Sequence, residues 1–404
     1  MKKTACLLAS LMMLLGSTAF AQNYTPGTYV GESGGRNGVV KVEAEYSADA
    51  IVSAKVIEHS ETPGISDAPI AQLPEEYVKY QSLGLDVISG ATLTSNAILA
   101  ALEQTAAAAG ADVEALKAAP VEAKTAGEDE VLSADIVVVG AGGAGLAAAV
   151  SASEQGASVI VLEKTVAVGG NTLRSGGWYN SADQERQKNL EMSEAQKATV
   201  EAMLAKEAVN EKMAQLQQTL QTEWDAYKAE GGTYLFDSPT FHALQTYDGG
   251  DYLGNIDLIA EYANEAPNTL KWLESLGMQT NPTVTMCVGA LWQRSHSVVG
   301  NTNVGYGYIE TVHRAAEEKG VQILFETRGT ELMTDENNAV IGVRAEKSDG
   351  TKLTVNAAKG VILATGGFGG DLDKVREIRS DIPETIKTTS SSACTGDGIW
   401  MAQA

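Results

Sequence analysis

The sequence predicts two folded units in tandem: a small α+β domain over residues 25–108 and a larger α/β domain over residues 134–404. In the first unit, apolar and polar side chains alternate over residues 40–46 and 51–57, which is typical of antiparallel strands with one solvent-facing side. In the second unit, residues 134–139 form a largely apolar run, which is typical of a strand buried in a parallel sheet. The two patterns therefore predict an antiparallel sheet in the first unit and a parallel sheet in the second.

The composition is sufficient for two cores and marks the boundary between them. Of the 404 residues, 44% are hydrophobic, which is enough for two domains of ordinary size. Residues 106–130 consist mostly of Ala, Glu, Lys, Gly and Asp, with almost no large apolar side chain. We therefore expect helices over residues 73–82 and 96–107, followed by a solvated linker over residues 109–133.

The first residues have the pattern of an export signal. The chain begins Met-Lys-Lys, continues with an apolar run over residues 5–15, and has Ala-Phe-Ala at 19–21, which together predict a secretory signal peptide over residues 1–21. The apolar run is too short to span a bilayer, and Cys6 lies inside it, so we expect no lipid anchor. The predicted location is the periplasm or the cell envelope.

Charge and cysteine content exclude several classes of function. The formal net charge of −23 becomes −25 without the two lysines of the leader, and such an acidic surface repels nucleic acid. Without the leader only Cys287 and Cys394 remain, which provides neither a disulfide framework nor a thiolate cluster for a metal. We expect no metal site and no nucleic-acid partner, so redox chemistry requires an organic cofactor.

The second unit opens with a complete dinucleotide fingerprint. The strand at 134–139 leads into Gly-Ala-Gly-Gly-Ala-Gly and an Ala-rich helix, and a second strand ends in an acid about twenty residues later. Glycines permit a tight turn and a close approach to pyrophosphate at the helix N-terminus, while the acid suits ribose hydroxyls. The pattern predicts a Rossmann-like fold whose cofactor-binding residues include Gly140, Gly142, Ala144, Gly145 and Glu163.

Further motifs resemble the fumarate reductase and succinate dehydrogenase class of flavoproteins, which indicates FAD. Gly-Gly-Asn-Thr at 169–172 and Ser-Gly-Gly at 175–177 resemble that class's second flavin contact, and residues 361–369 and 395–398 resemble two later flavin segments. Small residues suit a flat ring that lies on backbone. The resemblance implies FAD contacts at Asn171, Thr172, Gly176, Gly177, Gly329 and Asp397.

The region between these motifs reads as a helical insertion. Residues 181–232 and 264–276 have the spacing of amphipathic helices. Arg294-Ser295-His296 resembles a family segment, but Ser-Val follows where the family often has Arg-Pro, so we expect His296 to hold a loop rather than substrate. The remaining histidines have no partner pattern and are interpreted as packing or surface residues: His59, His242 and His313.

A second resemblance lies in the first unit. The run from Asp86 to Thr92 reads Asp-Val-Ile-Ser-Gly-Ala-Thr, and its small residues let a ligand approach the backbone beside a helix start that Thr94 or Ser95 could cap. This run is similar to the flavinylation motif of FMN-binding domains, in which a flavin transferase joins FMN to the threonine through a phosphoester. The resemblance implies covalent FMN on Thr92. The alternatives are noncovalent binding and an ordinary turn that caps a helix.

The resemblance also predicts what the chain lacks. In this family the polypeptide continues past the Gly-Asp-Gly loop into a clamp domain and a closing flavin segment, whereas this chain ends at Ala404. We therefore expect a fragment of a longer product, with a short form that pairs with a second subunit as the alternative. The substrate-binding and proton-donating residues belong to the missing part, so we assign no catalytic residue.

The function implied is an exported reductase of anaerobic respiration. Electrons from an external donor, a cytochrome or a membrane quinol- or NADH-linked system, would enter at FMN and pass through FAD to an α,β-unsaturated carboxylate such as fumarate, urocanate or cinnamate. One alternative is an FAD-dependent dehydrogenase or oxidase of the same superfamily, which usually lacks the FMN domain. The other is an electron carrier without a substrate of its own.

Overall fold

The chain divides into two compact units, each described here by itself. The computed structural model describes residues 23–88, 90–121, 125–300 and 305–404, so the expected signal peptide lies outside the described residues. One unit comprises residues 1–61 and 66–123, and the other comprises residues 62–65 and 124–404.

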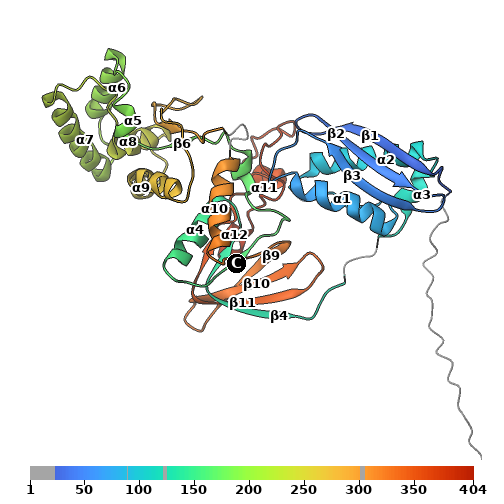
Figure 1. Cartoon of the computed structure of the whole chain (residues 1–404). Coiled ribbons are helices and arrows are strands. Elements are labelled where there is room, and N and C mark those ends of the chain that lie inside the picture. Colours follow the sequence, from blue (N-terminus) through green and yellow to red (C-terminus); the bar gives the residue numbers. More distant parts are fainter. Residues whose placement is uncertain (1–22, 89, 122–124, 301–304) are drawn as a thin grey trace, which may run out of the picture. The chain divides into compact units, whose positions relative to one another are not determined.

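The first unit is an antiparallel sheet covered by helices, as the alternating pattern predicts. Its three strands pair in the order β1-β2-β3, with bounds Gly27–Gly34, Val39–Tyr46 and Ile51–Glu58. Figure 1 shows α1 (Asp67–Tyr80) and α2 (Thr92–Ala108) along one face of this sheet. Alternate residues of β2 are buried against them, namely Val40, Val42, Ala44 and Tyr46.

Helix α2 begins four residues earlier than expected, which corrects the predicted capping. Its N-cap is Ala91, which makes no side-chain capping bond, and Thr92 is its first residue. Ser95 Oγ donates to the carbonyl of Ala91 at 3.0 Å, and the Thr94 hydroxyl donates to Glu61. Both side chains lie inside the first turn and face the domain interior, whereas a capping residue must precede the turn. The prediction that Thr94 or Ser95 caps the helix is therefore wrong.

Part of the expected linker is folded. Residues Val113–Ala118 form helix α3, capped by the Asp112 side chain, which accepts from the amide of Ala115. Leu116 is buried in the first unit, and its carbonyl accepts from the amide of Leu83 at 3.0 Å. Leu116 is the one buried residue of this short helix, so composition over a long window does not reveal the anchor.

The second unit is built on a six-stranded mixed sheet. Its strands lie in the order β8-β5-β4-β11-β10-β9. The first four are parallel to one another, while β10 and β9 run antiparallel to their neighbours. The strands are β4 (Glu130–Val139), β5 (Val159–Leu162), β8 (Gln322–Leu324), β9 (Thr327–Thr334), β10 (Val340–Lys347) and β11 (Lys352–Leu363).

Apolar side chains cover both faces of the C-terminal half of β4, as its largely apolar sequence predicts. Val138 faces helices α4 (Gly143–Glu154) and α10 (Tyr306–Glu318), which Figure 1 shows beside the sheet. Val137 and Val139 belong to a separate cluster with residues of β5, β10 and β11. Burial on both faces holds the end of β4 in place, and this end carries the glycine turn.

The predicted helical insertion has its own aromatic core. It contains α5 (Gln184–Gln187), α6 (Glu194–Ala205), α7 (Glu211–Ala229), α8 (Pro239–Gly249) and α9 (Ile256–Ser275). Trp224 stacks on Tyr227 with ring centroids 4.9 Å apart, and Phe241 meets Trp292 edge-on at 4.9 Å. A short two-stranded sheet, β6 (Tyr179–Asn180) with β7 (Ser295–His296), accompanies the insertion.

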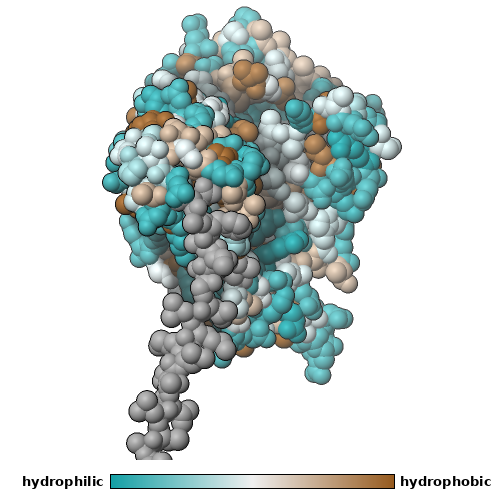
Figure 2. Space-filling model, turned by 90° about the vertical axis from the view of Figure 1, so that its right-hand side faces the viewer, coloured by the Kyte–Doolittle hydropathy of each residue, from teal (hydrophilic) through white to brown (hydrophobic). Residues whose placement is uncertain are grey.

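The face of the molecule seen in Figure 2 is mainly hydrophilic. Figure 2 shows hydrophilic residues over most of the face that it presents, with hydrophobic residues in small separate groups. Across the part of the chain that the structure describes, every helix is too short or too polar to cross a membrane.

Candidate cofactor-binding sites

The glycine turn after β4 has the backbone geometry that its sequence predicts. Gly140 has a φ of +103°, and Gly142 is the N-cap of α4. A Cβ on Gly145 would lie 1.8 Å from the carbonyl oxygen of Gly140, so the helix could not pack this close to the strand with any larger residue. Ala144 lies exposed in the first turn of α4.

A second pair of glycines faces this turn. Gly169 forms a β-bridge with Gly142, and its amide donates to the carbonyl of Ala141 at 2.8 Å. A Cβ on Gly142 or Gly170 would meet its nearest neighbour only at 3.9 Å, so space remains open beside both backbones. An open backbone cradle at a helix N-terminus fits the pyrophosphate of a dinucleotide.

Glu163 ties the glycine turn to the end of β5. One oxygen of its buried carboxylate accepts from the amide of Ala141 at 2.8 Å. The other accepts from the amide and the hydroxyl of Thr165 at 2.9 and 2.8 Å. A carboxylate offers roughly four lone-pair sites, so one remains for a ribose hydroxyl. The contact between Glu163 and the ribose stays a prediction. The structure adds a second role, in which Glu163 holds the glycine turn through the amide of Ala141.

The side chains of Asn171 and Thr172 connect protein segments. They lie in the 3₁₀ helix η1 (Gly170–Arg174), and Thr172 Oγ1 accepts from the amide of Gly143 at 3.3 Å. Asn171 accepts from the amide of Ser391 at 2.7 Å and donates to Cys394 Sγ at 3.1 Å. These bonds hold η1 beside α4 and beside the turn at 391–394. They leave the Thr172 hydroxyl hydrogen and one amide hydrogen of Asn171 as donors for a contact with FAD.

The three other predicted glycines occupy different surroundings. Gly176 and Gly177 follow η1, and the amide of Gly177 donates to Ser175 Oγ at 3.2 Å. Gly329 is buried in β9, where a Cβ would lie 3.0 Å from a methyl of Val139. Gly329 therefore lies beside the end of β4, on the same edge of the sheet as the glycine turn.

Asp397 is the centre of a charged cluster. It is the first residue of α12 (Asp397–Gln403), and its buried carboxylate accepts from Lys164 Nζ and Arg328 Nε, both at 3.0 Å. Thr395 Oγ1 donates to it at 2.7 Å. Burial raises the pKa of Asp397, but hydrogen bonds from Thr395 and Lys164 and the charge of Arg328 outweigh burial and hold that pKa below its ordinary value.

Sequence reasoning missed three residues of this site. Lys164 directly follows Glu163, and Arg328 directly precedes Gly329, so their neighbours in sequence were the available signal. Thr365 follows β11, and its hydroxyl accepts from the amide of Gly398 at 3.1 Å. Together these contacts bring the ends of several strands and α12 to one edge of the sheet, which is where dinucleotides bind in such folds.

The predicted FMN site lies in the first unit. Thr92 is exposed at the start of α2, and the N-cap residue of this helix, Ala91, makes no side-chain hydrogen bond to the first turn. Gly90 has a φ of +88°, and open space surrounds the position of a Cβ there. Ser89 lies outside the described residues. An exposed hydroxyl next to a helix N-terminus without a side-chain cap fits a phosphate.

The histidines are buried or peripheral, which agrees with their interpretation as packing residues. His296 is fully buried between the carbonyl of Tyr179 and the carboxylate of Asp183, both at 3.1 Å. Burial and the nearby charge of Arg294 lower the pKa of His242 to about 3. Arg294 itself forms a buried ion pair with Asp237 at 2.7 Å.

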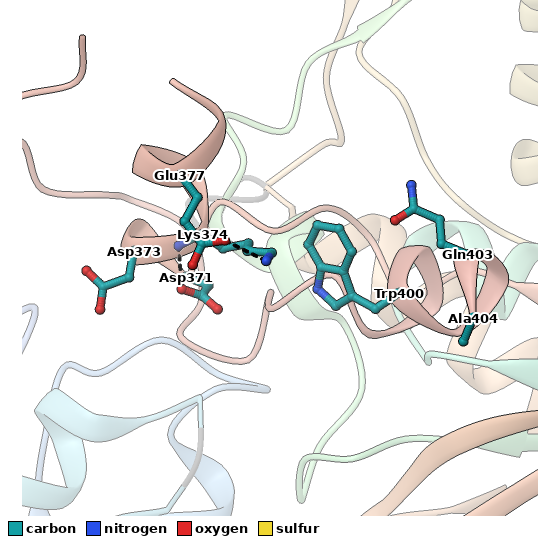
Figure 3. A pocket seen from close by; sticks show the side chains of 7 residues that line it. All are labelled: Asp371, Asp373, Lys374, Glu377, Trp400, Gln403 and Ala404. Atoms are coloured by element: carbon teal, nitrogen blue, oxygen red, sulfur yellow. Dashed lines mark hydrogen bonds and ion pairs between the residues drawn. The ribbon is translucent and has the colours of Figure 1, made fainter. Parts of the chain in front are cut away.

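An open pocket of about 710 Å³ lies between α11 (Leu372–Ile378) and α12. Figure 3 shows the side chains that line it, and Lys374 Nζ lies 5.1 Å from the ring centre of Trp400. None of the predicted cofactor residues lines this pocket. Among the residues described, no three His, Cys, Asp or Glu side chains are grouped to hold a metal ion.

Two family models match the chain. Residues 135–395 match the model described as FAD dependent oxidoreductase, and residues 35–107 match the FMN-binding domain. The chain is 35% identical to the NADH:acrylate oxidoreductase of Vibrio harveyi, covering 94% of this chain and 39% of that protein. It is 28% identical to the urocanate reductase of Eggerthella lenta, covering 93% of this chain and 55% of that protein.

Other comparisons agree with this fold. The chain is 28% identical to a cytochrome fumarate reductase of Shewanella frigidimarina, covering 67% of this chain and 39% of that protein. The solved open form of a flavocytochrome c3 fumarate reductase aligns with a TM-score of 0.53 at 24% identity, covering 69% of this chain and 41% of that one. This chain spans about half or less of the length of these relatives. The match over residues 135–395 covers more than half of the chain, which therefore belongs to the FAD-dependent oxidoreductase family and carries an FMN-binding domain ahead of its FAD-binding domain.

Proposed function

We propose that this chain is the flavin-binding part of an exported reductase of α,β-unsaturated carboxylates. The observation that carries the proposal is the likeness to the NADH:acrylate oxidoreductase over 94% of the chain, a span that includes both flavin domains. Other relatives are named for urocanate and fumarate. All three acids have a carbon–carbon double bond conjugated with a carboxylate, so the proposed substrate class is defined by that group.

Residues of the second unit that meet at the sheet edge would hold FAD. The backbones of Gly142 and Gly170 would receive the pyrophosphate, and Glu163 would bind the ribose. The backbone of Gly329, at the same edge of the sheet, would contact the adenine end. Bound FAD and FMN supply the redox chemistry, with electron entry at FMN and hydride delivery at FAD.

Thr92 would carry FMN as a phosphoester. A flavin transferase that uses FAD as the donor would join the Thr92 oxygen to the phosphorus of the FMN half. The pyrophosphate bond breaks, AMP leaves with the bonding electrons, and the hydroxyl proton passes to a base. The exposed position of Thr92 supports access by such an enzyme.

The electron donor and location follow from the proposed role. The predicted signal peptide would direct the protein to the periplasm or the cell envelope, where a cytochrome or a quinol- or NADH-linked membrane system would supply electrons. The named relatives include an NADH-dependent enzyme and a cytochrome-linked one, which supports a dedicated donor of either kind. The FMN domain favours this reading over an FAD-dependent dehydrogenase or oxidase.

Anaerobic reoxidation tests the proposal. The whole gene product that contains residues 1–404 is produced with a flavin transferase, and its flavins are reduced with a stoichiometric amount of dithionite. Acrylate, fumarate, urocanate or cinnamate is then added while flavin absorbance is followed. Reoxidation by one of these acids, and by none of their saturated analogues, is expected. Reoxidation of the reduced flavins by a redox protein alone would instead favour an electron carrier. Reduction of the oxidised flavins by a saturated acid, in a parallel sample without dithionite, would favour a dehydrogenase.

A further inference from the structure

A buried carboxylate lies beneath the proposed attachment site. Glu61 follows β3 by three residues and is only 4% exposed. One of its oxygens accepts from the amide of Asn37, in the turn between β1 and β2, at 2.9 Å. The other accepts from the hydroxyl of Thr94, in the first turn of α2. Glu61 therefore joins the β1–β2 turn to the start of the helix that bears Thr92.

The surrounding backbone is adapted to this carboxylate. A Cβ on Gly35 would lie 2.6 Å from the Glu61 oxygen that binds Asn37, so the turn approaches it as closely as glycine allows. Burying a carboxylate costs free energy, which its hydrogen bonds and the positive end of the α2 dipole partly offset. A neutral apolar side chain would avoid that cost, so the contact with Thr94 calls for an explanation beyond packing.

Holding Thr94 determines which way Thr92 points. Residues two apart on an α-helix point in nearly opposite directions, since each residue turns the helix by about 100°. Thr94 is 4% exposed and faces Glu61, while Thr92 is exposed on the other side. Ser95 fastens the same turn, because its hydroxyl donates to Ala91 at 3.0 Å and accepts from the amide of Ile88 at 3.1 Å.

We infer that Glu61 is a positioning residue for the attachment of FMN to Thr92, a role that rests on the function proposed above. Through Thr94 it anchors the inner side of the first turn of α2, and this orients the Thr92 hydroxyl toward the transferase and its FAD donor. Glu61 is bonded to Thr94 and Asn37 rather than to Thr92, so it acts on the orientation of the acceptor and not on the chemical step.

The initial rate of modification tests this inference. Purified transferase and FAD are added to the unmodified chain, and intact mass records the gain of FMN in Glu61→Ala, Thr94→Val and Glu61→Gln. We expect Glu61→Ala and Thr94→Val to slow the reaction about tenfold, the scale of one lost hydrogen bond. Glu61→Gln should restore most of the rate, since its amide can accept from Asn37 and donate to Thr94. Glu75→Ala, an exposed site on α1, is the matched control and should react at the parental rate.

Hydrogen exchange separates positioning from general instability. The amides of residues 95–98, the first in α2 that have intrahelical acceptors, should exchange faster in Glu61→Ala and Thr94→Val, while those of the sheet stay protected. If the parent chain gains no FMN, both the proposed attachment of FMN to Thr92 and the inference about Glu61 are wrong. If the parent is modified and Glu61→Ala reacts equally fast, only the positioning role is overturned. Should Glu61→Ala fail to fold, Thr94→Val and Glu61→Gln provide the same comparison.

Discussion

Lys164 Nζ lies 3.0 Å from the carboxylate of Asp397, although the two residues are 233 positions apart in the chain. This ion pair fastens the start of α12 to the end of β5, next to Glu163. Because Arg328 binds the same carboxylate, one negative charge is shared by two cations at the sheet edge. Removing that charge would leave Lys164, whose side chain is only 25% exposed, without its ion-pair partner.

Asp397→Asn should therefore loosen the FAD site. We expect FAD affinity to fall by roughly tenfold to a hundredfold, on the scale of a lost charged hydrogen bond. Equilibrium dialysis against FAD at low and high salt measures the effect. Asp373→Asn, on the exposed side of α11, serves as the control. Equal FAD affinity in the Asp397 variant and the parent would show that the cluster has no part in the site.

The pKa of Asp397 also predicts an acid sensitivity. Because that pKa is lowered in the folded chain, the unfolded state takes up the proton first as pH falls. The stabilisation is thus present above the unfolded value of about 4 and is lost below it. Urea unfolding at pH 6 and pH 3.5 should show a smaller pH effect in Asp397→Asn than in the parent, and an identical effect would contradict the assignment.

Charge reversal at Glu163 should weaken FAD binding. Glu163→Lys removes the acceptor for the Ala141 amide and the predicted acceptor for the ribose, so we expect a loss of roughly 1.5–3 kcal/mol in binding free energy. Fluorescence titration with FAD provides the measurement. Glu336→Lys makes the same charge change at an exposed turn and should bind as the parent does. Full FAD retention in Glu163→Lys would mean that the ribose lies elsewhere.

The sequence predicts those parts of the site that depend on particular residue types a few positions apart in the chain. The glycine turn could be predicted because Gly140 and Gly145 serve local geometry within a few residues of a buried strand. The cluster of Lys164, Arg328 and Asp397 could not, because pairing across such distances is decided by the folded sheet. The start of α2 was misplaced for a related reason. Thr94 and Ser95 have the residue types of capping positions, yet a distant acid, Glu61, draws Thr94 inward.

Gly145→Ala should destabilise the contact between α4 and β4, whereas a methyl group added at an uncrowded glycine should not. The added Cβ would lie 1.8 Å from the Gly140 carbonyl, so α4 must move away from β4 and the cradle must open. We expect a loss of about 1–3 kcal/mol in stability together with weaker FAD binding. Gly360→Ala in β11 adds the same methyl where no atom lies within 4 Å and should be close to neutral. Thermal unfolding and FAD titration measure the stability and the FAD affinity of both variants. Equal values in Gly145→Ala and Gly360→Ala would refute the packing argument.

His242 should make the helical insertion sensitive to mild acid. Its pKa is lowered to about 3 by burial and by Arg294, whereas an unfolded histidine titrates near 6.5. As pH falls through that interval, only the unfolded state gains the proton. The free energy of unfolding therefore declines from about pH 6.5 downward, and the decline ends near the folded value.

His242→Leu places an apolar side chain in the same buried position on α8 and removes the titrating group. The measurement is urea unfolding at pH 7.5 and pH 5, followed by tryptophan fluorescence because Trp224 and Trp292 lie in the core of the insertion. The parent should lose more stability between the two pH values than His242→Leu does. His313→Leu is the control, since His313 lies at the partly exposed surface of α10. If the pH effect is unchanged in His242→Leu and reduced in His313→Leu, then His313 causes it and the assignment to His242 is wrong.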